Sequence, residues 1–280
     1  PADQTGLELA DGFRASVVAD EIGGARHLVV RDNGDIYVML SKKNQDGGIA
    51  ALRDTDGDGA ADEIRYFGDY VGTGIEIHDG HLYFSSDTSI HRYQLAEGEL
   101  VPSGEPEQIV GGFPFQQQHA AKPFTFDGEG NLYVMVGAPS NACQEQDRQK
   151  GSPGQDPCPL LERQASVWRF DAATPGQTQM ADGYQYATGI RHIVALKWND
   201  AVNALYAVQH GRDQLHYLYP DLYTEQESAQ LPAEEFLLIR DGDNFGWPYC
   251  YYDQLQGKKV LAPEYGGDGD EVGRCADAKD

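Results

Sequence analysis

The residues best suited to chemistry in this sequence are histidines and arginines that flank short apolar segments. His119 lies in a polar stretch before one apolar run, and Arg191 and His192 lie directly before another, with Arg212 just after it. A neutral imidazole can accept a proton near pH 7, and a guanidinium binds carboxylates through two parallel hydrogen bonds. Grouped cations in a chain of formal net charge −24 favour a bound organic anion. A structural role for His119, and pairing of the arginines with neighbouring acids, are the open alternatives.

A second pattern is acidic. Asp54, Asp56 and Asp58 alternate around a glycine turn, and Asp62 follows at the ninth position of the same loop. Carboxylates at alternate positions are typical of loops that wrap calcium. The twelfth position is an arginine, where an EF-hand loop has a bidentate glutamate. We expect a structural calcium ion in a loop between strands, and an acidic turn without metal is the alternative.

The charge of the chain excludes several partners. Asp and Glu total 45 against 21 Lys and Arg, and such a surface repels nucleic acids and anionic membranes. No apolar run approaches the ~18 residues of a membrane-spanning helix, so we expect no membrane insertion. The first four residues form no basic-then-apolar leader, so we expect that any secretory signal has been removed.

The four cysteines are Cys143, Cys158, Cys250 and Cys275. They show neither a C-x-x-C pair nor zinc-ligand spacing. Three disulfide connectivities are possible, and the simplest joins neighbours in sequence, Cys143 to Cys158 and Cys250 to Cys275. A bridge that closes a loop of about 15 residues contributes roughly 3 kcal/mol. Disulfides indicate an oxidising compartment, and so a periplasmic or secreted protein, whereas free thiols are the alternative.

The elements that position these residues are short and repeated. Four segments share a short apolar strand, a turn rich in Asp, Asn or Gly, and a second strand that contains a tyrosine between apolar residues. They are His27–Leu40, Gly74–Phe84, Pro123–Val136 and Ile193–Val208, with Tyr37, Tyr83, Tyr133 and Tyr206 at equivalent places.

The spacing of the first three tyrosines is close to the roughly 40–50 residues of a four-stranded propeller blade. A polar insertion, residues 138–164, widens the third interval and holds the first two cysteines. The sequence therefore predicts an all-β fold: residues 1–280 form a single β-propeller domain of about four blades plus connecting loops. We expect the native chain to continue beyond Asp280, or a partner segment to complete the ring. A β-sandwich is the alternative fold.

Several motifs together resemble one enzyme family. Their order matches the PQQ-dependent glucose/sorbosone dehydrogenases from about Gly6 to Cys275, with the L-sorbosone dehydrogenase-like branch most similar. The motifs are His119-Ala120-Ala121-Lys122, Gly189-Ile190-Arg191-His192, His210-Gly211-Arg212-Asp213 and Asn244-Phe245-Gly246-Trp247-Pro248-Tyr249-Cys250.

This resemblance implies a six-bladed propeller that binds pyrroloquinoline quinone (PQQ) and Ca²⁺. It implies that His119 is the general base and that Arg191 contacts the quinone carbonyl, with His192, Gly211 and Arg212 also at the cofactor. The backbone carbonyls of Gly211 and Arg212 would be calcium ligands. Two positions depart from the glucose enzymes, since His192 stands in place of Asn and Arg212 in place of Pro.

The sequence thus predicts a quinoprotein oxidoreductase. It would oxidise a small sugar, an aldose or a sugar aldehyde, by hydride transfer to PQQ and pass the electrons to an external acceptor. The alternatives are a calcium-dependent propeller lactonase or other hydrolase, and a non-catalytic propeller that binds carbohydrate or protein. A spectral change of bound quinone on addition of sugar supports the first interpretation alone.

Overall fold

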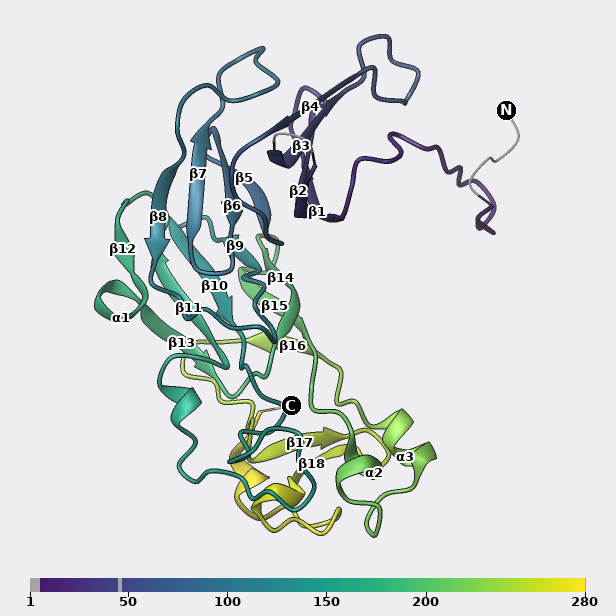
Figure 1. Cartoon of the computed structure of the whole chain (residues 1–280), viewed down its shortest axis with the longest axis vertical. Coiled ribbons are helices and arrows are strands. Elements are labelled where there is room, and N and C mark those ends of the chain that lie inside the picture. Colours follow the sequence, from purple (N-terminus) through teal and green to yellow (C-terminus); the bar gives the residue numbers. More distant parts are fainter. Residues whose placement is uncertain (1–5, 45–46, 280) are drawn as a thin grey trace. The chain divides into compact units, whose positions relative to one another are not determined.

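A computed structural model describes residues 6–44 and 47–279 of the chain (Figure 1). The first four residues, on which the expectation of a removed leader rests, lie outside the described ranges. The chain divides into two compact units. The first unit is Pro1–Ser86 with Ile90–Gln108, and the second is Asp87–Ser89 with Ile109–Asp280.

The first sheet is a four-stranded antiparallel meander. Its strands, in the spatial order β1-β2-β3-β4, are Ala25–Val30, Ile36–Asn44, Gly47–Arg53 and Glu63–Phe67. Tyr37 to Leu40 on β2 are all buried. An inner strand buried on both faces is what a propeller blade requires, because each blade packs against its neighbours.

The second sheet has the order β12-β8-β7-β6-β5. Four of its strands follow one another in the chain, and the short β12, Gln177–Thr178, pairs parallel with β8. The consecutive strands β5 to β8 are Ile75–His78, His81–Ser85, Ile90–Gln94 and Glu107–Gly111.

The third sheet has the order β13-β11-β10-β9, and most of its residues are buried. Its strands β9, β10, β11 and β13 are Phe124–Phe126, Asn131–Val136, Ser166–Asp171 and Tyr184–Thr188. Five consecutive residues of β10, from Leu132, are buried.

The fourth sheet contains β14, Ile193–Asn199, β15, Ala204–Gln209, and β16, Glu235–Ile239. Burial alternates along β15, so one face of this sheet packs on the third sheet and shares a core with it. A hairpin of β17, Cys250–Asp253, and β18, Lys258–Leu261, follows.

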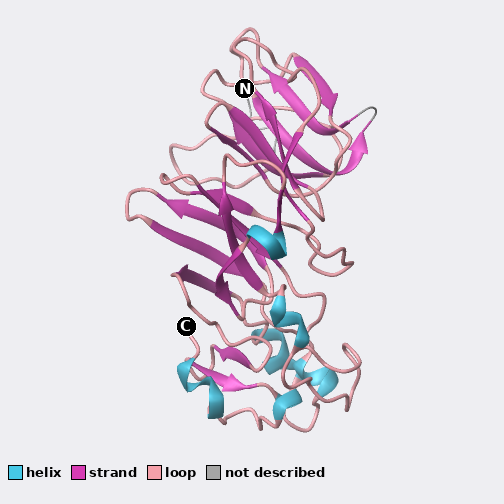
Figure 2. Ribbon diagram, turned by 90° about the vertical axis from the view of Figure 1, so that its left-hand side faces the viewer, coloured by secondary structure: helices cyan, strands magenta, loops and turns pink. Residues whose placement is uncertain are grey.

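Helices are short, and those described fall between residues 159 and 277 (Figure 2). None of the described helices is long and apolar enough to cross a membrane. The α-helices α1 to α3 are Gln179–Asp182, Leu215–Leu218 and Glu225–Gln230, and the 3-10 helices are Pro159–Glu162, Pro263–Tyr265 and Gly273–Asp277.

The four repeat tyrosines occupy equivalent places, as the sequence predicts. Each lies on the second strand of its sheet: Tyr37 on β2, Tyr83 on β6, Tyr133 on β10 and Tyr206 on β15. The chain is an all-β propeller with about four blades, and the predicted fold class is confirmed.

Both local disulfides are confirmed. Cys143 is bonded to Cys158 and Cys250 to Cys275. The two stapled loops also contact each other, since the Tyr249 hydroxyl accepts a hydrogen bond from the Cys158 amide at 2.9 Å. The two disulfides indicate an oxidising compartment of the extracellular type.

Candidate functional site

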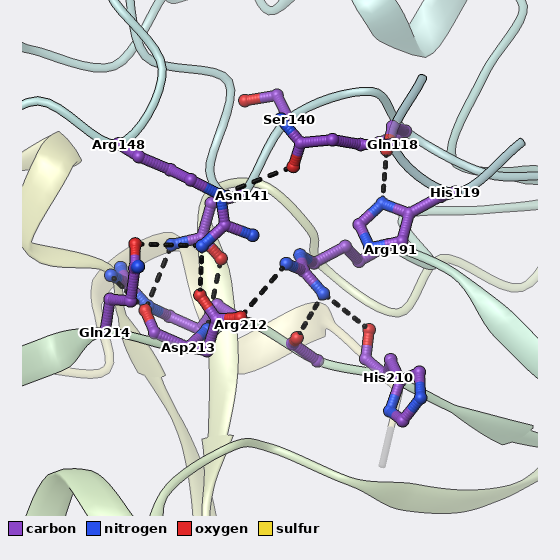
Figure 3. A network of polar contacts seen from close by, with 12 residues as sticks. Gln118, His119, Ser140, Asn141, Arg148, Arg191, His210, Arg212, Asp213 and Gln214 are labelled. Atoms are coloured by element: carbon purple, nitrogen blue, oxygen red, sulfur yellow. Dashed lines mark hydrogen bonds and ion pairs between the residues drawn. The ribbon is translucent and has the colours of Figure 1, made fainter. Parts of the chain in front are cut away.

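The basic residues singled out from the sequence converge within the second unit (Figure 3). His119 precedes β9, Arg191 lies in the turn between β13 and β14, and His210 follows β15. The disulfide-bonded insertion adds Asn141 and Arg148 to the same group. Strand ends of three sheet segments therefore meet at one polar cluster.

His119 is held in a single tautomer. Its Nδ1 lies 2.6 Å from the Ala138 carbonyl oxygen, and a carbonyl only accepts, so Nδ1 carries the hydrogen. The lone pair of the neutral ring is then on Nε2. Burial, and secondarily the charge of Arg191, lower the pKa of His119 to about 4. The ring is therefore a neutral proton acceptor at pH 7.

His192 stacks on His119, with ring centroids 4.8 Å apart and planes inclined by 23°. Only glycine at position 137 permits this, because a Cβ there would lie 2.6 Å from His192 Nδ1 and 2.9 Å from His119 Cβ. Burial lowers the pKa of His192 to about 2. Its Nδ1 is buried without a hydrogen-bond partner within the described ranges. The pair is thus two neutral imidazoles in contact.

Arg191 is 3% exposed and retains unused donors. Its Nη1 donates to the carbonyls of Gly211 at 2.7 Å and His210 at 3.4 Å. Nη2 lies 3.6 Å from a carboxylate oxygen of Asp213, and buried Nε has no hydrogen-bond partner in the described part of the chain. Burial lowers the pKa of Arg191 to about 10, so the group keeps its charge.

Arg148 joins the cluster, and the sequence interpretation missed it. Its Nη1 donates to Asp213 Oδ1 at 2.6 Å and to Gln214 Oε1 at 2.8 Å. Asn141 fixes the same segment, since its side chain donates to the Asp213 carbonyl and accepts from the Asp213 amide. The Asp213 carboxylate therefore lies between Arg148 and Arg191. The one feature of the sequence that could have indicated Arg148 is that a basic residue lies inside an insertion closed by two cysteines.

Arg212 contributes differently from Arg191. Its guanidinium is 2% exposed and forms a buried ion pair with Glu264, 5.8 Å above the Tyr251 ring. The side chain is thus committed to contacts with Glu264 and Tyr251 and does not join the Arg191 cluster. The neighbouring Gly211 cannot carry a Cβ, which would lie 2.2 Å from the Ala233 carbonyl oxygen.

The acidic loop lies in the first unit, and it is fully exposed. Oxygens of Asp54, Asp56 and Asp58 come within 4.8 Å of one another, an arrangement able to hold a cation. Asp62 does not join them, because its carboxylate accepts from the backbone and hydroxyl of Thr55, each at 2.7 Å. Backbone donors from Gly59 and Gly57 lower the pKa of Asp54. The loop's shape therefore depends on local hydrogen bonds.

The fold relates the chain to proteins of known structure. The chain is a propeller structurally related, at low sequence identity, to the PQQ-dependent sugar dehydrogenases. The family model described as TrAA12-like matches residues 7–261. The chain belongs to that family. No curated protein matches the sequence significantly.

Solved structures show the same fold at low identity. The calcium structure of the Trichoderma reesei carbohydrate-active enzyme family AA12 protein superposes with a TM-score of 0.74 at 16% identity, covering 97% of this chain and 70% of that one. The PQQ domain of pyranose dehydrogenase from Coprinopsis cinerea, in its holo form, gives 0.68 at 15% identity, with 88% and 59% covered. PQQ-bound aldose sugar dehydrogenase from Streptomyces coelicolor gives 0.52 at 19%, with 83% and 65% covered.

Proposed function

We propose that this chain is part of a quinoprotein oxidoreductase that oxidises an aldose or sugar aldehyde by hydride transfer to PQQ. The observation that carries the proposal is the pairing of a neutral imidazole, His119, with a buried cation that has unused donors, Arg191. A proton acceptor beside a fixed positive charge is what oxidation of an alcohol requires, since the hydroxyl oxygen loses a proton while its carbon loses a hydride.

The donor set fits an anionic quinone. Arg191 Nε, which has no hydrogen-bond partner among the described residues, and Nη2 are donors that a ligand with carbonyl and carboxylate oxygens would satisfy. The carbonyls of Gly211 and Arg212 suit calcium, which prefers oxygen ligands. PQQ, when bound, supplies the two-electron acceptor that the side chains lack.

The protein's own groups then have distinct tasks. His119 Nε2 accepts the hydroxyl proton of the sugar, and the hydrogen bond from Nδ1 to Ala138 keeps that lone pair directed outward. Arg191 stays charged and would stabilise the negative charge that develops on the bound quinone. Asp213, shared with Arg148, orients Arg191 through its carboxylate. Electrons leave to an external acceptor.

Substrate branch, assembly and localisation complete the proposal. The order of the sequence motifs favours the L-sorbosone dehydrogenase-like branch, while His192 and Arg212, which depart from the glucose enzymes, make the identity of the sugar a question for the sugar panel below. Residues 1–280 would be one propeller domain completed by a further segment, in keeping with coverage of 70% of the Trichoderma chain. The two disulfides support a periplasmic or secreted protein.

A second calcium ion would bind the acidic loop. Asp54, Asp56 and Asp58 supply converging oxygens, and Asp62 supports the loop through Thr55. Isothermal titration with calcium tests this assignment, since Asp56→Asn should abolish one binding event and leave any other intact.

One optical titration tests the proposed function. The native full-length protein is loaded with PQQ and calcium and then mixed with a panel of aldoses and sugar aldehydes. We expect at least one sugar to reduce the bound quinone and so to change its absorbance. A protein that hydrolyses lactones without PQQ, or binds sugar with no absorbance change, would contradict it.

A further inference from the structure

The first unit contains a cavity that the proposed function does not use. It has a volume of about 360 Å³ and lies between the end of β4 and the turn that follows β7. A volume of this size is within the range of small-molecule sites. Its lining is formed by Phe67, Gly68, Asp69, Tyr70, Tyr93, Pro102, Gly104, Glu105 and Pro106.

Tyr93 directs a polar group into this cavity. The residue is 5% exposed, and its ring packs against Phe67 at 5.5 Å and Phe84 at 5.4 Å. Its hydroxyl has no hydrogen-bond partner in residues 6–44 or 47–279. Burial first, and then the negative charges of Glu105 and Asp69, raise the pKa of Tyr93. Tyr93, Asp69 and Glu105 all belong to the lining of the cavity.

Tyr70 provides a fixed aromatic surface. One face of its ring stacks on His91, with centroids 4.2 Å apart and planes inclined by 28°. The residue is nevertheless 36% exposed, so part of the ring stays accessible at the cavity. The ring also lies 5.8 Å from that of Phe84, at 44°, and a partly exposed ring fixed in this way is suited to stacking against an apolar ligand face.

The charge of the lining favours a neutral ligand rich in hydroxyl donors. The Asp69 carboxylate is already paired with Lys43 at 2.7 Å, whereas Glu105 has no basic partner among the described residues. The cavity therefore offers several acceptors and one uncompensated charge, that of Glu105. An organic cation would gain only from Glu105, while a polyol can donate to both carboxylates.

We propose that this cavity is a saccharide-binding site in the first unit, separate from the residues that carry the proposed oxidation. A pyranose ring would place its apolar face on Tyr70 and donate hydroxyl hydrogen bonds to Asp69 and Glu105. The Tyr93 hydroxyl would form a further hydrogen bond. The site would hold a carbohydrate rather than oxidise it, since His119 and Arg191 lie in the second unit.

The test is binding of cellobiose, xylobiose and mannobiose, each measured by calorimetry and by saturation-transfer NMR on PQQ-free native protein. Tyr93→Phe removes a single hydroxyl without altering the packed ring and should weaken binding about 5-fold. Tyr70→Ala should weaken it about 10-fold or more. Tyr184→Ala, an exposed tyrosine in the second unit (47% exposed), is the matched control and should have no effect.

Three outcomes would overturn the proposal. The first is that none of the disaccharides binds. The second is that binding is unchanged in both Tyr70→Ala and Tyr93→Phe. The third is that tetramethylammonium displaces the disaccharide and binds more tightly. Binding that is lost in His119→Ala but kept in Tyr70→Ala would assign the saccharide to the polar cluster. Quinone reduction does not involve Tyr70 or Tyr93, so failure here is distinguishable from failure of the proposed function.

Discussion

The acidic loop of the first unit and the histidine–arginine cluster of the second are both sets of charged or titratable residues, but different forces shape them. The loop is built within nine residues, and its carboxylates are exposed and held by nearby amides. The cluster unites residues far apart in sequence, such as the stacked His119 and His192, and its pKa shifts come first from burial. Water screens charges in the loop, whereas in the cluster it has been largely removed.

This difference sets the size of the expected effects. An exposed charge loses little when its partner is removed, but a buried polar group left without a partner pays the full cost of its desolvation. Changes in the cluster should therefore alter function strongly, and changes in the loop should have local consequences.

The largest effect should come from His119→Ala. Loss of the proton acceptor should lower kcat by roughly 10²–10⁴, while PQQ still binds, because Arg191 and the carbonyls remain. Steady-state kinetics and quinone fluorescence measure the two properties separately. Near-native turnover in this variant would show that the base lies elsewhere.

Removal of the Cys143–Cys158 bridge should be next. The bonded residues are 15 apart in sequence, and a loop of about this length stabilises the fold by roughly 3 kcal/mol. Urea unfolding of the Cys143→Ser/Cys158→Ser protein should show that loss. Since Arg148 lies in the stapled loop, activity should also fall below what the unfolded fraction explains. Unchanged stability would mean that contacts with Tyr249 suffice.

Acid should destabilise both units through buried histidines. Burial lowers the pKa of His91 in the first unit to about 4 and that of His192 in the second to about 2. Below about pH 6.5, the pKa of histidine in the unfolded chain, these histidines are protonated in the unfolded state and remain neutral in the folded state. Stability therefore falls as pH falls. Each histidine should cost about 2 kcal/mol between pH 7 and pH 5.

Denaturant titrations at the two pH values measure this acid sensitivity. His91→Gln should reduce the difference between pH 7 and pH 5, because it removes the group in the first unit that resists protonation. Equal stability of the parent protein at both pH values would show that the histidines titrate normally.

Arg148→Gln should give the smallest effect within the cluster. The Arg148–Asp213 pair is partly exposed, and such pairs contribute up to about 1 kcal/mol. We expect kcat/KM to fall about 5-fold, a change of that size. Arg65→Gln, which breaks an exposed pair beside the acidic loop, is the control and should leave kcat/KM unchanged. If Arg148→Gln and Arg65→Gln had equal effects on kcat/KM, the buried cluster and the acidic loop would not differ in their importance for activity.

Local patterns in the sequence predicted most of the fold. The strand–turn–strand repeats place Tyr37 and Tyr133 correctly, because alternating apolar residues and turn residues act over a few positions. Neighbouring cysteines likewise pair within single loops. The convergence of Asp54, Asp56 and Asp58 was also predictable from their spacing.

Contacts distant in sequence could not be predicted in this way. Arg148 meets Asp213 across 65 residues, and Arg212 meets Glu264 across 52. Both pairings depend on how the stapled loops and the β17–β18 hairpin pack, which no local pattern encodes. Asp62 was assigned to the metal group by position, whereas its carboxylate accepts a hydrogen bond from the hydroxyl of Thr55, seven residues earlier.

The most direct test of the central claim is a paired measurement of PQQ affinity. Quinone fluorescence is titrated, with calcium present, against the parent protein, Arg191→Ala and the triple variant Asp54→Asn/Asp56→Asn/Asp58→Asn. If the buried cluster holds the cofactor, Arg191→Ala should weaken binding at least about 10-fold, since it removes a charged hydrogen-bonding group, and the triple variant should bind as the parent does. Unchanged affinity in Arg191→Ala, or loss of affinity in the loop variant alone, would contradict this account.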